Sequence, residues 1–179
     1  MRTIVAAVGL VAVLGGVSPA SIDQVRPVPS VDLSRYAGEW FEIARFPNRF
    51  QVQCAGEVRA EYRPRDDGRI DVVNSCRTAD GKDTVARGIA RVVDTKSSAT
   101  LKVRFAPALL SFLPFVWGDY WIIGLADDYR WAVVGSPDRN YLWVLSRTPS
   151  MPEPVYDAAI ATARASGFDT SRLQRTRQR

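Results

Sequence analysis

Residues 54–76, CAGEVRAEYRPRDDGRIDVVNSC, decide the fold of this chain. On each side of the central PRDDG, residues 64–68, small or apolar side chains alternate with charged or polar ones. This period of two is typical of a strand with one buried face, and a cluster of proline, aspartate and glycine between two such strands is typical of a turn. The segment therefore predicts an antiparallel hairpin.

The two cysteines of the chain lie at the two ends of this segment. In the register that places Ala60 opposite Ile70, nearly all apolar residues of the hairpin share one face, and Cys54 lies opposite Cys76. Directly opposed strand residues have Cβ atoms within bridging distance. We therefore expect a disulfide between Cys54 and Cys76, with two free buried thiols as the alternative.

The same period of two extends over residues 38–147, with turn signals at short intervals. Antiparallel strands that follow one another in sequence close naturally into a barrel, which holds either packed side chains or one small ligand. We therefore predict an all-β fold, an eight-stranded up-and-down antiparallel β-barrel. Its strands are expected at residues 39–45, 52–63, 69–77, 84–93, 100–105, 118–126, 129–135 and 141–147.

The last three of these strands are apolar on both faces, so both faces need cover. Tight turns place Ile122 opposite Val133 and Trp131 opposite Leu145 on the face that is turned into the barrel. The other face needs a different partner. We expect that partner to be a helix packed on the outside of the barrel.

A C-terminal helix is predicted at residues 151–165, where apolar residues recur at helical spacing. Ser150 and Glu153 have the spacing of a capping box, and Gly167 is expected to end the helix. Its apolar stripe supplies the cover that the last strands need.

The composition excludes several kinds of site. The chain has 179 residues, which suits one domain, and it has no histidine and two cysteines. Ser-His-Asp and Cys-His catalysis and histidine-ligated metal sites are therefore excluded, and two cysteines cannot form a Cys₄ site. We expect no metal and no cofactor.

The charge is unevenly distributed. The chain has 24 basic and 19 acidic residues, a formal net charge of +5, and its last nine residues contain arginine but no acid. A nucleic-acid surface needs basic residues gathered on the folded domain, so we expect no nucleic-acid partner. Residues 174–179 are predicted to form a basic tail, either solvated or in loose contact with anionic lipid headgroups.

Residues 1–20 have the form of a signal peptide, with Arg2, an apolar stretch and small residues up to Ala20. The alternative is a transmembrane anchor, but the apolar run is shorter than the roughly 20 residues that span a bilayer. We expect cleavage after Ala20, a linker at residues 21–31 and one domain at residues 32–173. The mature chain is then exported to an oxidising compartment, where a disulfide persists.

Three short motifs lie at the ends of predicted strands: Gly38-Glu39-Trp40, Asp127-x-Tyr129 and Ser146-Arg147. Together they resemble the three signatures of the lipocalin family, and their surroundings resemble its bacterial lipocalin (Blc) type. One Gly-x-Trp alone is unspecific, whereas three signatures at matching strand positions are specific. The resemblance extends over residues 31–173 and implies the same barrel.

The resemblance implies structural roles for Gly38, Trp40, Asp127, Tyr129 and Arg147. Glycine lets the chain enter the first strand, and the tryptophan closes the barrel base. Because the last strand should end where the first begins, the Arg147 guanidinium can stack on the Trp40 indole. In the alternative, Trp40 is one more core aromatic and Arg147 a surface charge.

The resemblance also implies a function, since relatives carry fatty acids or lysophospholipids. We expect a non-enzymatic lipid-binding carrier in the periplasm or at the periplasmic face of an outer membrane, as a monomer or homodimer. Many bacterial relatives carry an anchoring cysteine at the signal exit, and this chain has none there. The residues expected to line the ligand cavity are Val58, Ala60, Tyr62, Val72, Asn74, Ala90, Leu101, Val103, Tyr120, Ile122, Trp131, Val133, Tyr141 and Trp143.

Two further features bear on the cavity. Gly56, Gly88 and Gly124 are expected to face inward, where small residues leave room for a ligand. The apolar connection at residues 106–117 should lie at the open end, where it can serve as a lid, a membrane contact or a dimer surface, or fold back into the mouth.

Two other functions remain open at this point. A lipocalin-type enzyme, an isomerase or de-epoxidase for example, would need a free Cys54 or Cys76 as nucleophile, or Glu42 and Asp119 working without histidine. Glu42 shares the parity of the inward Trp40, and the sequence leaves its orientation undecided. A small-pigment or haem binder would need tyrosine as the axial ligand.

Overall fold

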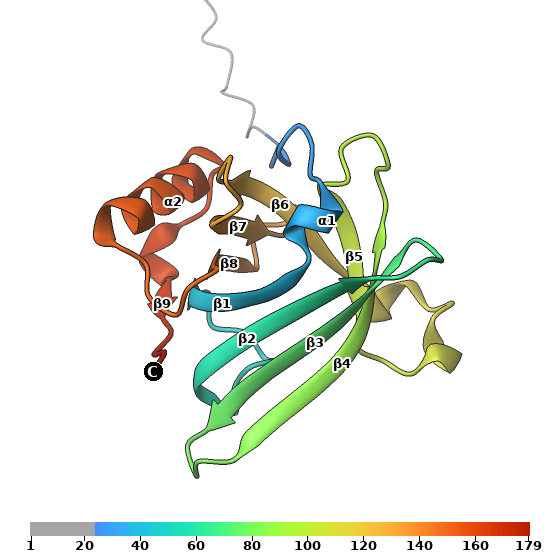
Figure 1. Ribbon diagram of the computed structural model, residues 1–179, viewed down its shortest axis with the longest axis horizontal. Helices are drawn as coiled ribbons and strands as arrows, with labels where there is room; N and C mark the ends of the chain where they lie inside the picture. Colours follow the sequence, from blue (N-terminus) through green and yellow to red (C-terminus); the bar gives the residue numbers. More distant parts are fainter. Residues whose placement is uncertain (1–23) are drawn as a thin grey trace, which may run out of the picture.

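The structure, a computed structural model, describes residues 24–179. Eight antiparallel strands follow one another around a closed barrel, because β8 pairs with β1 and β1 also pairs with β2 (Figure 1). The predicted fold class is confirmed. The strands are β1 Gly38–Arg45, β2 Cys54–Pro64, β3 Arg69–Thr78, β4 Asp83–Val92, β5 Thr100–Arg104, β6 Gly118–Leu125, β7 Trp131–Gly135 and β8 Leu142–Ser146. The predicted signal peptide, residues 1–20, lies outside the described residues.

Short helical elements and a ninth strand surround the barrel. Helix α2, Glu153–Ala165, packs on the outside against β6 and β7, as predicted (Figure 1). Gly167 follows it with a φ of +81°, a conformation that suits glycine at a helix end. The other elements are α1 Leu33–Tyr36, β9 Gln174–Arg175 and the 3₁₀ turns Ala108–Leu110, Pro114–Val116 and Thr170–Arg172.

The start of α2 differs from the predicted capping box. Pro152 occupies the N-cap position, and no side chain caps the first turn. The backbone carbonyl of Ser150 accepts a hydrogen bond from the Thr148 hydroxyl instead. Proline in the first turn has a pre-set φ and lacks the N–H that a cap would otherwise satisfy, so the helix begins without a box.

The register of the β2–β3 hairpin differs from the prediction. Ile70 lies opposite Pro64, whereas we expected Ala60 there. The loop explains the shift: the Arg65 and Arg69 backbones are hydrogen bonded, and Gly68 has a φ of +77°. A hairpin loop that ends on a left-handed glycine centres the turn later in the sequence. Because the shift is an even number of residues, the predicted inward face is retained.

The disulfide is present although the cysteines are not directly opposed. Cys54 lies opposite Thr78, and its Cα is 5.5 Å from that of Cys76. Two irregularities in the first half of β2 break the regular ladder on either side of Gly56. The predicted Cys54–Cys76 bridge is therefore confirmed, but the register from which we expected it is wrong.

Strand β7 faces the other way from the prediction. A β-bulge at Ile123 shifts its pairing with β6, so that Ile122 lies opposite Val134. A shift of one residue exchanges the two faces of a strand. Trp131 and Val133, both expected to line the ligand cavity, therefore pack in the outer cluster beneath α2.

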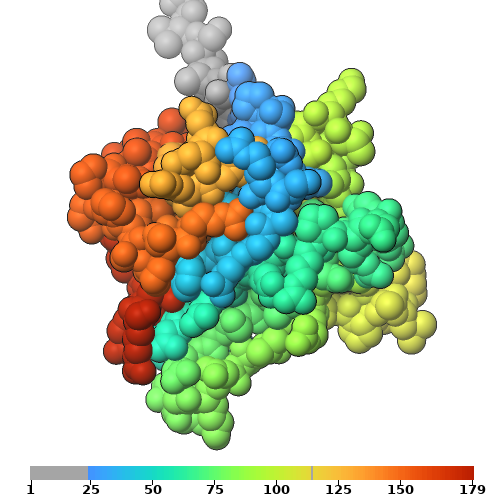
Figure 2. All heavy atoms as spheres, viewed as in Figure 1, coloured from blue at the N-terminus to red at the C-terminus, as the bar shows by residue number. Residues whose placement is uncertain are grey.

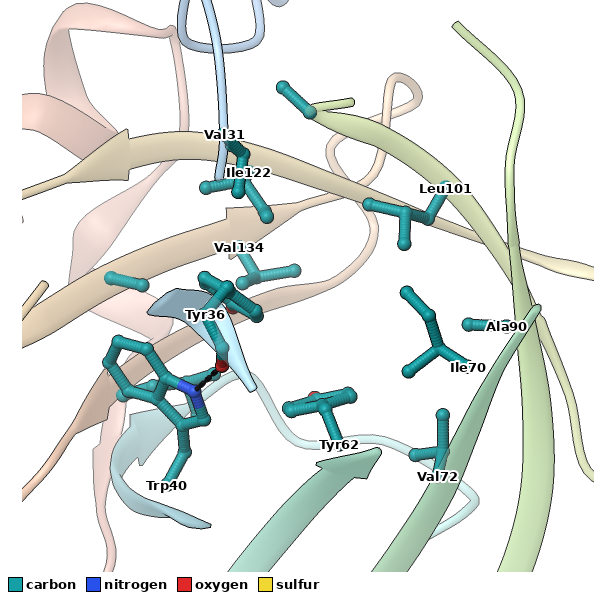
Figure 3. Close-up of a cluster of buried hydrophobic side chains, with 13 residues drawn as sticks. Val31, Tyr36, Trp40, Tyr62, Ile70, Val72, Ala90, Leu101, Ile122 and Val134 are labelled. Atoms are coloured by element: carbon teal, nitrogen blue, oxygen red, sulfur yellow. Dashed lines mark hydrogen bonds between the residues drawn. The ribbon is translucent and has the colours of Figure 1, made fainter. Parts of the chain in front are cut away.

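The apolar side chains form two clusters separated by the barrel wall. The inner cluster fills the barrel, and Figure 3 shows ten of its side chains pointing toward one another. The outer cluster lies between α2 and strands β1, β6, β7 and β8. The two clusters explain why the last three strands are apolar on both faces.

Two segments that were predicted to lie outside the domain pack against the barrel. In the described part of the expected linker, residues 24–31, Val25 packs in the outer cluster and Val31 in the inner one, and the Val28 N–H donates to the Ile122 carbonyl. Residues 174–178 of the expected basic tail pair with the barrel wall. Buried valines hold the first segment, and backbone hydrogen bonds hold the second.

Candidate functional site

The base of the barrel is closed by Trp40 and Arg147. Trp40 is fully buried, and its indole N–H donates to the Tyr36 carbonyl at 2.8 Å (Figure 3). The Arg147 guanidinium lies 3.9 Å from the centroid of the Trp40 ring and donates to the carbonyls of Arg35 and Glu39. The predicted stacking of these two residues is confirmed.

The second signature lies at the same end. The Arg147 Nε donates to the carbonyl of Tyr129, whose hydroxyl accepts from the Asp32 N–H at 2.8 Å. Arg35 stacks on the Tyr129 ring at 4.0 Å and donates to the carbonyl of Asp127. The motifs therefore bind α1, the β6–β7 loop and the start of β1 into one plug.

The first signature needs its glycine because of the backbone conformation at that position. Gly38 has a φ of +91°, a conformation that favours glycine, and it lies beside the Arg147 guanidinium. Glycine thus lets β1 begin directly against the guanidinium that closes the base.

Above the plug, three tyrosines form a buried hydrogen-bonded chain. The Tyr120 hydroxyl is 2.8 Å from that of Tyr36 and accepts from that of Tyr62 at 2.9 Å. Burial raises the pKa of Tyr62 to about 12 and raises the pKa values of the other two well above their usual range. All three remain neutral near pH 7 and satisfy one another's polar atoms inside an apolar interior.

The closed half of the barrel is nearly filled. Its cavity, bordered by Tyr36, Tyr62 and Tyr120, has a volume of about 10 Å³. That volume is close to the lower limit for one water molecule, so an acyl chain does not fit here without movement of side chains.

Most of the residues predicted to line the cavity do face the barrel interior. Nine of them belong to the inner cluster or pack against it, and Asn74 lies between the inward Ala60 and Ala86 of the neighbouring strands. The nine are Ala60, Tyr62, Val72, Ala90, Leu101, Val103, Tyr120, Ile122 and Trp143. Their contact with a ligand remains a prediction.

Four predicted residues lie elsewhere. Trp131 and Val133 face α2, as described above. Val58 is buried but belongs to neither cluster, and Tyr141 stacks on Trp143 with ring centroids 5.9 Å apart. The interior also includes Val134, which the prediction placed on the outer face.

The three glycines expected to leave room for a ligand are approached by other parts of the chain. A Cβ at Gly56 would lie 2.7 Å from the Arg177 carbonyl oxygen, and one at Gly88 would lie 2.7 Å from the Phe105 ring. A Cβ at Gly124 would lie 2.8 Å from Thr162 of α2. Each glycine therefore permits a close approach within the fold, and the expectation of free space at these positions is wrong.

Glu42, whose orientation the sequence left undecided, is the centre of a buried polar network. Its side chain is 3% exposed and accepts hydrogen bonds from Arg45, Gln51 and Thr176. Gln51 in turn accepts from the Trp143 indole N–H at 3.0 Å. The network links β1, the β1–β2 loop, β8 and the C-terminal residues, and no sequence motif indicated it.

Asn74 also places a polar group in the interior, and the oxygen of its side-chain amide has no partner. The Asn74 Oδ1 atom is buried and makes no hydrogen bond within the described part of the chain. Small residues flank it on both neighbouring strands, Ala60 on β2 and Ala86 on β4. A buried amide oxygen without a partner is unfavourable, so this position suits a hydrogen-bond donor that comes from elsewhere.

A family model described as a lipocalin-like domain matches residues 31–178. The chain is a lipocalin. It is 41% identical over 157 residues to temperature-induced lipocalin-1 of Arabidopsis thaliana, which covers 87% of this chain and 83% of that protein. It is 40% identical over 157 residues to outer membrane lipoprotein Blc of Escherichia coli K12, with 87% and 84% covered. The similarity thus includes the expected bacterial type and a plant lipocalin equally.

Solved structures support the fold of this lipocalin. Insecticyanin from the tobacco hornworm Manduca sexta superposes with a TM-score of 0.68 at 22% identity, over 90% of this chain and 88% of that one. Lobster apocrustacyanin A1 gives a TM-score of 0.66 at 20% identity, over 82% and 79%. Identities this low show a shared fold only.

The connection at residues 105–117 lies along the outside of this lipocalin. Trp117 lies under the guanidinium groups of Arg91 and Arg104, and its indole N–H donates to the Ser111 carbonyl (Figure 2 shows the segment projecting from the barrel). Phe105 at its start packs over Gly88. The segment is thus anchored on the strands that flank it, while most of its large apolar side chains face solvent.

Three arginines near the mouth already have structural partners. Arg45 binds Glu42, Arg77 lies 3.4 Å from a Glu57 oxygen, and Arg139 donates to the Ser166 carbonyl. Between residues 24 and 179, no helix is long and apolar enough to cross a bilayer. Over the same range, no three His, Cys, Asp or Glu side chains gather as a metal-binding group.

Proposed function

We propose that this lipocalin is a carrier that binds one single-chain lipid, a fatty acid or a lysophospholipid, and releases it unchanged. Membership of the family supports a small hydrophobic ligand, and the apolar inner cluster supplies a surface for a hydrocarbon chain. Burying ten methylene groups is worth on the order of 8 kcal/mol before the costs of binding. A contribution of this size can hold a lipid reversibly, without a covalent bond.

The unpartnered Asn74 oxygen is the observation that carries this proposal. The tyrosine hydroxyls of the interior satisfy one another, so the single polar atom without a partner favours a ligand with one polar end and a long apolar remainder. The unpartnered oxygen accepts, so it suits a ligand group that donates, such as the hydroxyl of a lysophospholipid or a protonated carboxyl group. We propose that the polar end of the ligand binds Asn74, between Ala60 and Ala86.

The packed base determines which half of the barrel the acyl chain can occupy. Because the closed half is filled by tyrosines, the acyl chain is expected to occupy the other half and to displace Phe105, whose side chain is 45% exposed. Movement of this ring enlarges the space beside Gly88, although the Arg104 carbonyl oxygen still lies against that glycine. Ligand binding should therefore be accompanied by a change in the segment that follows Phe105.

Native mass spectrometry of the purified mature chain tests lipid carriage. We expect a co-purified acyl lipid, and saturable binding of a fluorescent fatty acid that Asn74→Leu weakens about tenfold, because the apolar substitute cannot pair with the polar end. Ser75→Ala, on the opposite face of β3, is the matched control. Absence of bound lipid together with failure to bind the fluorescent acid contradicts the proposal.

The engaged state of the candidate catalytic groups supports a carrier over an enzyme. Cys54 and Cys76 are joined in the disulfide, Asp119 pairs with Lys102 at 2.8 Å, and Glu42 is fully engaged in its network. Mass spectrometry of lipid recovered after incubation tests this proposal. The recovered mass should equal the added mass, and a shifted mass revives the enzyme alternative.

We further propose that residues 105–117 dock on an anionic membrane surface. Leu109, Phe112 and Phe115 are 82%, 75% and 79% exposed, an arrangement typical of side chains that enter a membrane interface. Beside them, Arg104 is 6% exposed and pairs with no carboxylate of the described chain, and Arg91 shares its aromatic platform. The apolar tip and its cationic support together suit anionic headgroups.

Vesicle flotation tests this docking. The wild-type chain should float with vesicles that contain phosphatidylglycerol and less with pure phosphatidylcholine, and Phe112→Ser with Phe115→Ser should abolish flotation. Val93→Ser, an exposed valine at the end of β4, is the control. If the double variant disrupts a dimer and leaves flotation unchanged, membrane docking is contradicted.

We also propose that this lipocalin acts at the periplasmic face of an outer membrane. The outer-membrane part of this proposal is supported by the relatives at about 40% identity, which are named outer membrane lipoproteins.

A further inference from the structure

The barrel wall has a seam between β1 and β2. The two strands pair only from Gly38 to Phe41, whereas Ala44 and Arg45 pair with β9. Residues 174–178, which we call the C-terminal strip, continue into the space where the two strands separate. In Figure 2 the C-terminal residues lie against the start of β2.

The backbone of the strip is hydrogen bonded to both sides of the seam. On one side, the Thr176 N–H donates to the Ile43 carbonyl at 2.9 Å. On the other, the Arg177 carbonyl accepts from the Glu57 N–H at 2.8 Å. The strip therefore replaces the ladder that β1 and β2 do not form with each other.

One side chain of the strip bridges the seam by itself. The Gln178 amide donates to the carbonyl of Glu42 on β1 at 2.7 Å and to the carbonyl of Val58 on β2 at 2.9 Å. Gly56 makes this insertion feasible, because a Cβ at that position would lie 2.7 Å from the Arg177 oxygen. Residues on the strip and on β2 thus both contribute to this insertion.

The strip is connected to the barrel interior through Glu42. The same carboxylate accepts from the Thr176 hydroxyl and from Gln51, and Gln51 accepts from the indole of Trp143, which packs against the inner cluster. A movement of the strip therefore removes a partner from a network whose other end touches the ligand chamber.

The strip is held mainly by polar contacts. Its side chains are exposed or half-buried and none belongs to either apolar cluster, while Arg175 pairs with Glu153 of α2 at 2.6 Å and lies 3.3 Å from the centroid of the Tyr156 ring. Segments with few buried apolar contacts open locally at a small fraction of the free energy of global unfolding. The strip can therefore leave the seam while the rest of the barrel stays folded.

We propose that the C-terminal strip is a releasable section of the barrel wall, and that its departure opens a side port between β1 and β2 for the ligand. The proposal rests on the proposed lipid carriage. In this proposal, Thr176, Gln178 and Gly56 affect the rate at which a ligand enters and leaves. The inward residues of the strands contact the bound ligand.

Substitution of Gly56 by alanine tests the port, because the added Cβ pushes the strip away from the Glu57 N–H without deleting any side chain of the strip. Gly118→Ala is the matched control, since its Cβ would meet only the Val103 oxygen, at 3.8 Å. Two quantities are measured on the full mature chain: amide hydrogen exchange at Glu57 and Thr176, and the rate at which dansyl-undecanoic acid leaves for excess lipid vesicles in stopped flow. We expect both to rise in Gly56→Ala, the exit rate about tenfold, which is about 1.4 kcal/mol.

A second pair of variants covers the case in which Gly56→Ala does not fold. Gln178→Leu removes the bridging amide, and Gln174→Ala removes an exposed side chain of the same strip that makes no side-chain hydrogen bond in the described structure. If amide hydrogen exchange in the strip becomes faster while the exit rate of the dansyl acid is unchanged, the side port is contradicted and lipid carriage is not. Failure of the dansyl acid to bind the wild-type chain overturns lipid carriage, and the port falls with it.

Discussion

The base of the barrel and the seam between β1 and β2 close the same wall by opposite means. At the base, Arg147 lies on the fully buried Trp40 and donates hydrogen bonds to three backbone carbonyls. At the seam, the C-terminal strip contributes backbone hydrogen bonds, the polar side chains of Thr176 and Gln178 and an ion pair of Arg175 with Glu153, but no buried side chain. Burial and a multidentate cation close the first end firmly, whereas polar contacts without buried apolar side chains leave the second able to open.

The largest effect is expected at the base. Arg147→Ala leaves three backbone carbonyls without their charged donor and removes the stacking on Trp40, so we expect a loss of about 4 kcal/mol in the free energy of unfolding. Arg147→Lys keeps the charge but not the planar fork, and should recover less than half of the loss. Urea denaturation measures both. A loss below about 1 kcal/mol in Arg147→Ala would falsify the view that the base is the more firmly closed end.

The disulfide should affect the seam more than the base. Cys54 and Cys76, 22 residues apart, anchor the part of β2 where the ladder is irregular. Replacing both with serine should cost about 3 kcal/mol in the chain-entropy model. Hydrogen exchange should increase first at Glu57, beside the seam, and later at Trp40. Equal increases at both amides would remove the contrast between the two ends.

High pH should destabilise the interior above the base. The pKa of Tyr62 is raised by burial to about 12, from a usual value near 10. Its contribution to stability is therefore complete below pH 10 and is lost as the pH rises through 12, because only the unfolded state releases its proton readily in that window. The loss should reach roughly 3 kcal/mol. In Tyr62→Phe, the free energy of unfolding should fall less steeply between pH 10 and 12 than in the wild type. Urea denaturation followed by circular dichroism measures this slope, and an unchanged slope contradicts the raised pKa of Tyr62.

The smallest effect is expected at the end of the chain. Arg179 lies 3.2 Å from a Glu57 oxygen, but its side chain is 68% exposed. Exposed ion pairs contribute little, so Arg179→Gln should change stability by less than about 0.5 kcal/mol and should leave ligand exit unchanged. A larger change, measured by the same urea titration, shows that charge rather than backbone pairing holds the strip.

The sequence predicted the elements and the base because both depend on local patterns. Alternation located all eight strands to within a few residues, and three short motifs located Trp40, Tyr129 and Arg147. The orientation of β7 was not predictable in this way. A strand that is apolar on both faces carries no signal for which face is inward, and the bulge at Ile123 decides it.

The C-terminal strip shows another limit of reading a sequence. Its residues are polar and charged, which is typical of a solvated end, and nothing in them indicates a partner some 130 positions earlier. The signal lay in Gly56 on β2, and we interpreted that glycine as room for a ligand. A glycine on a strand can mark either space or close approach, and only the fold distinguishes the two.

The position of Gln178 also constrains when the barrel can be completed. Its amide binds the Glu42 carbonyl across a separation of 136 residues, nearly the whole domain. Contacts so distant in sequence require a long loop to close, so we expect this one to form late in folding. A nascent chain can therefore form the hairpins one after another, but it cannot seal its wall until residues 174–178 have been synthesised. Closure of the seam is thus expected to follow the pairing of the sequential strands.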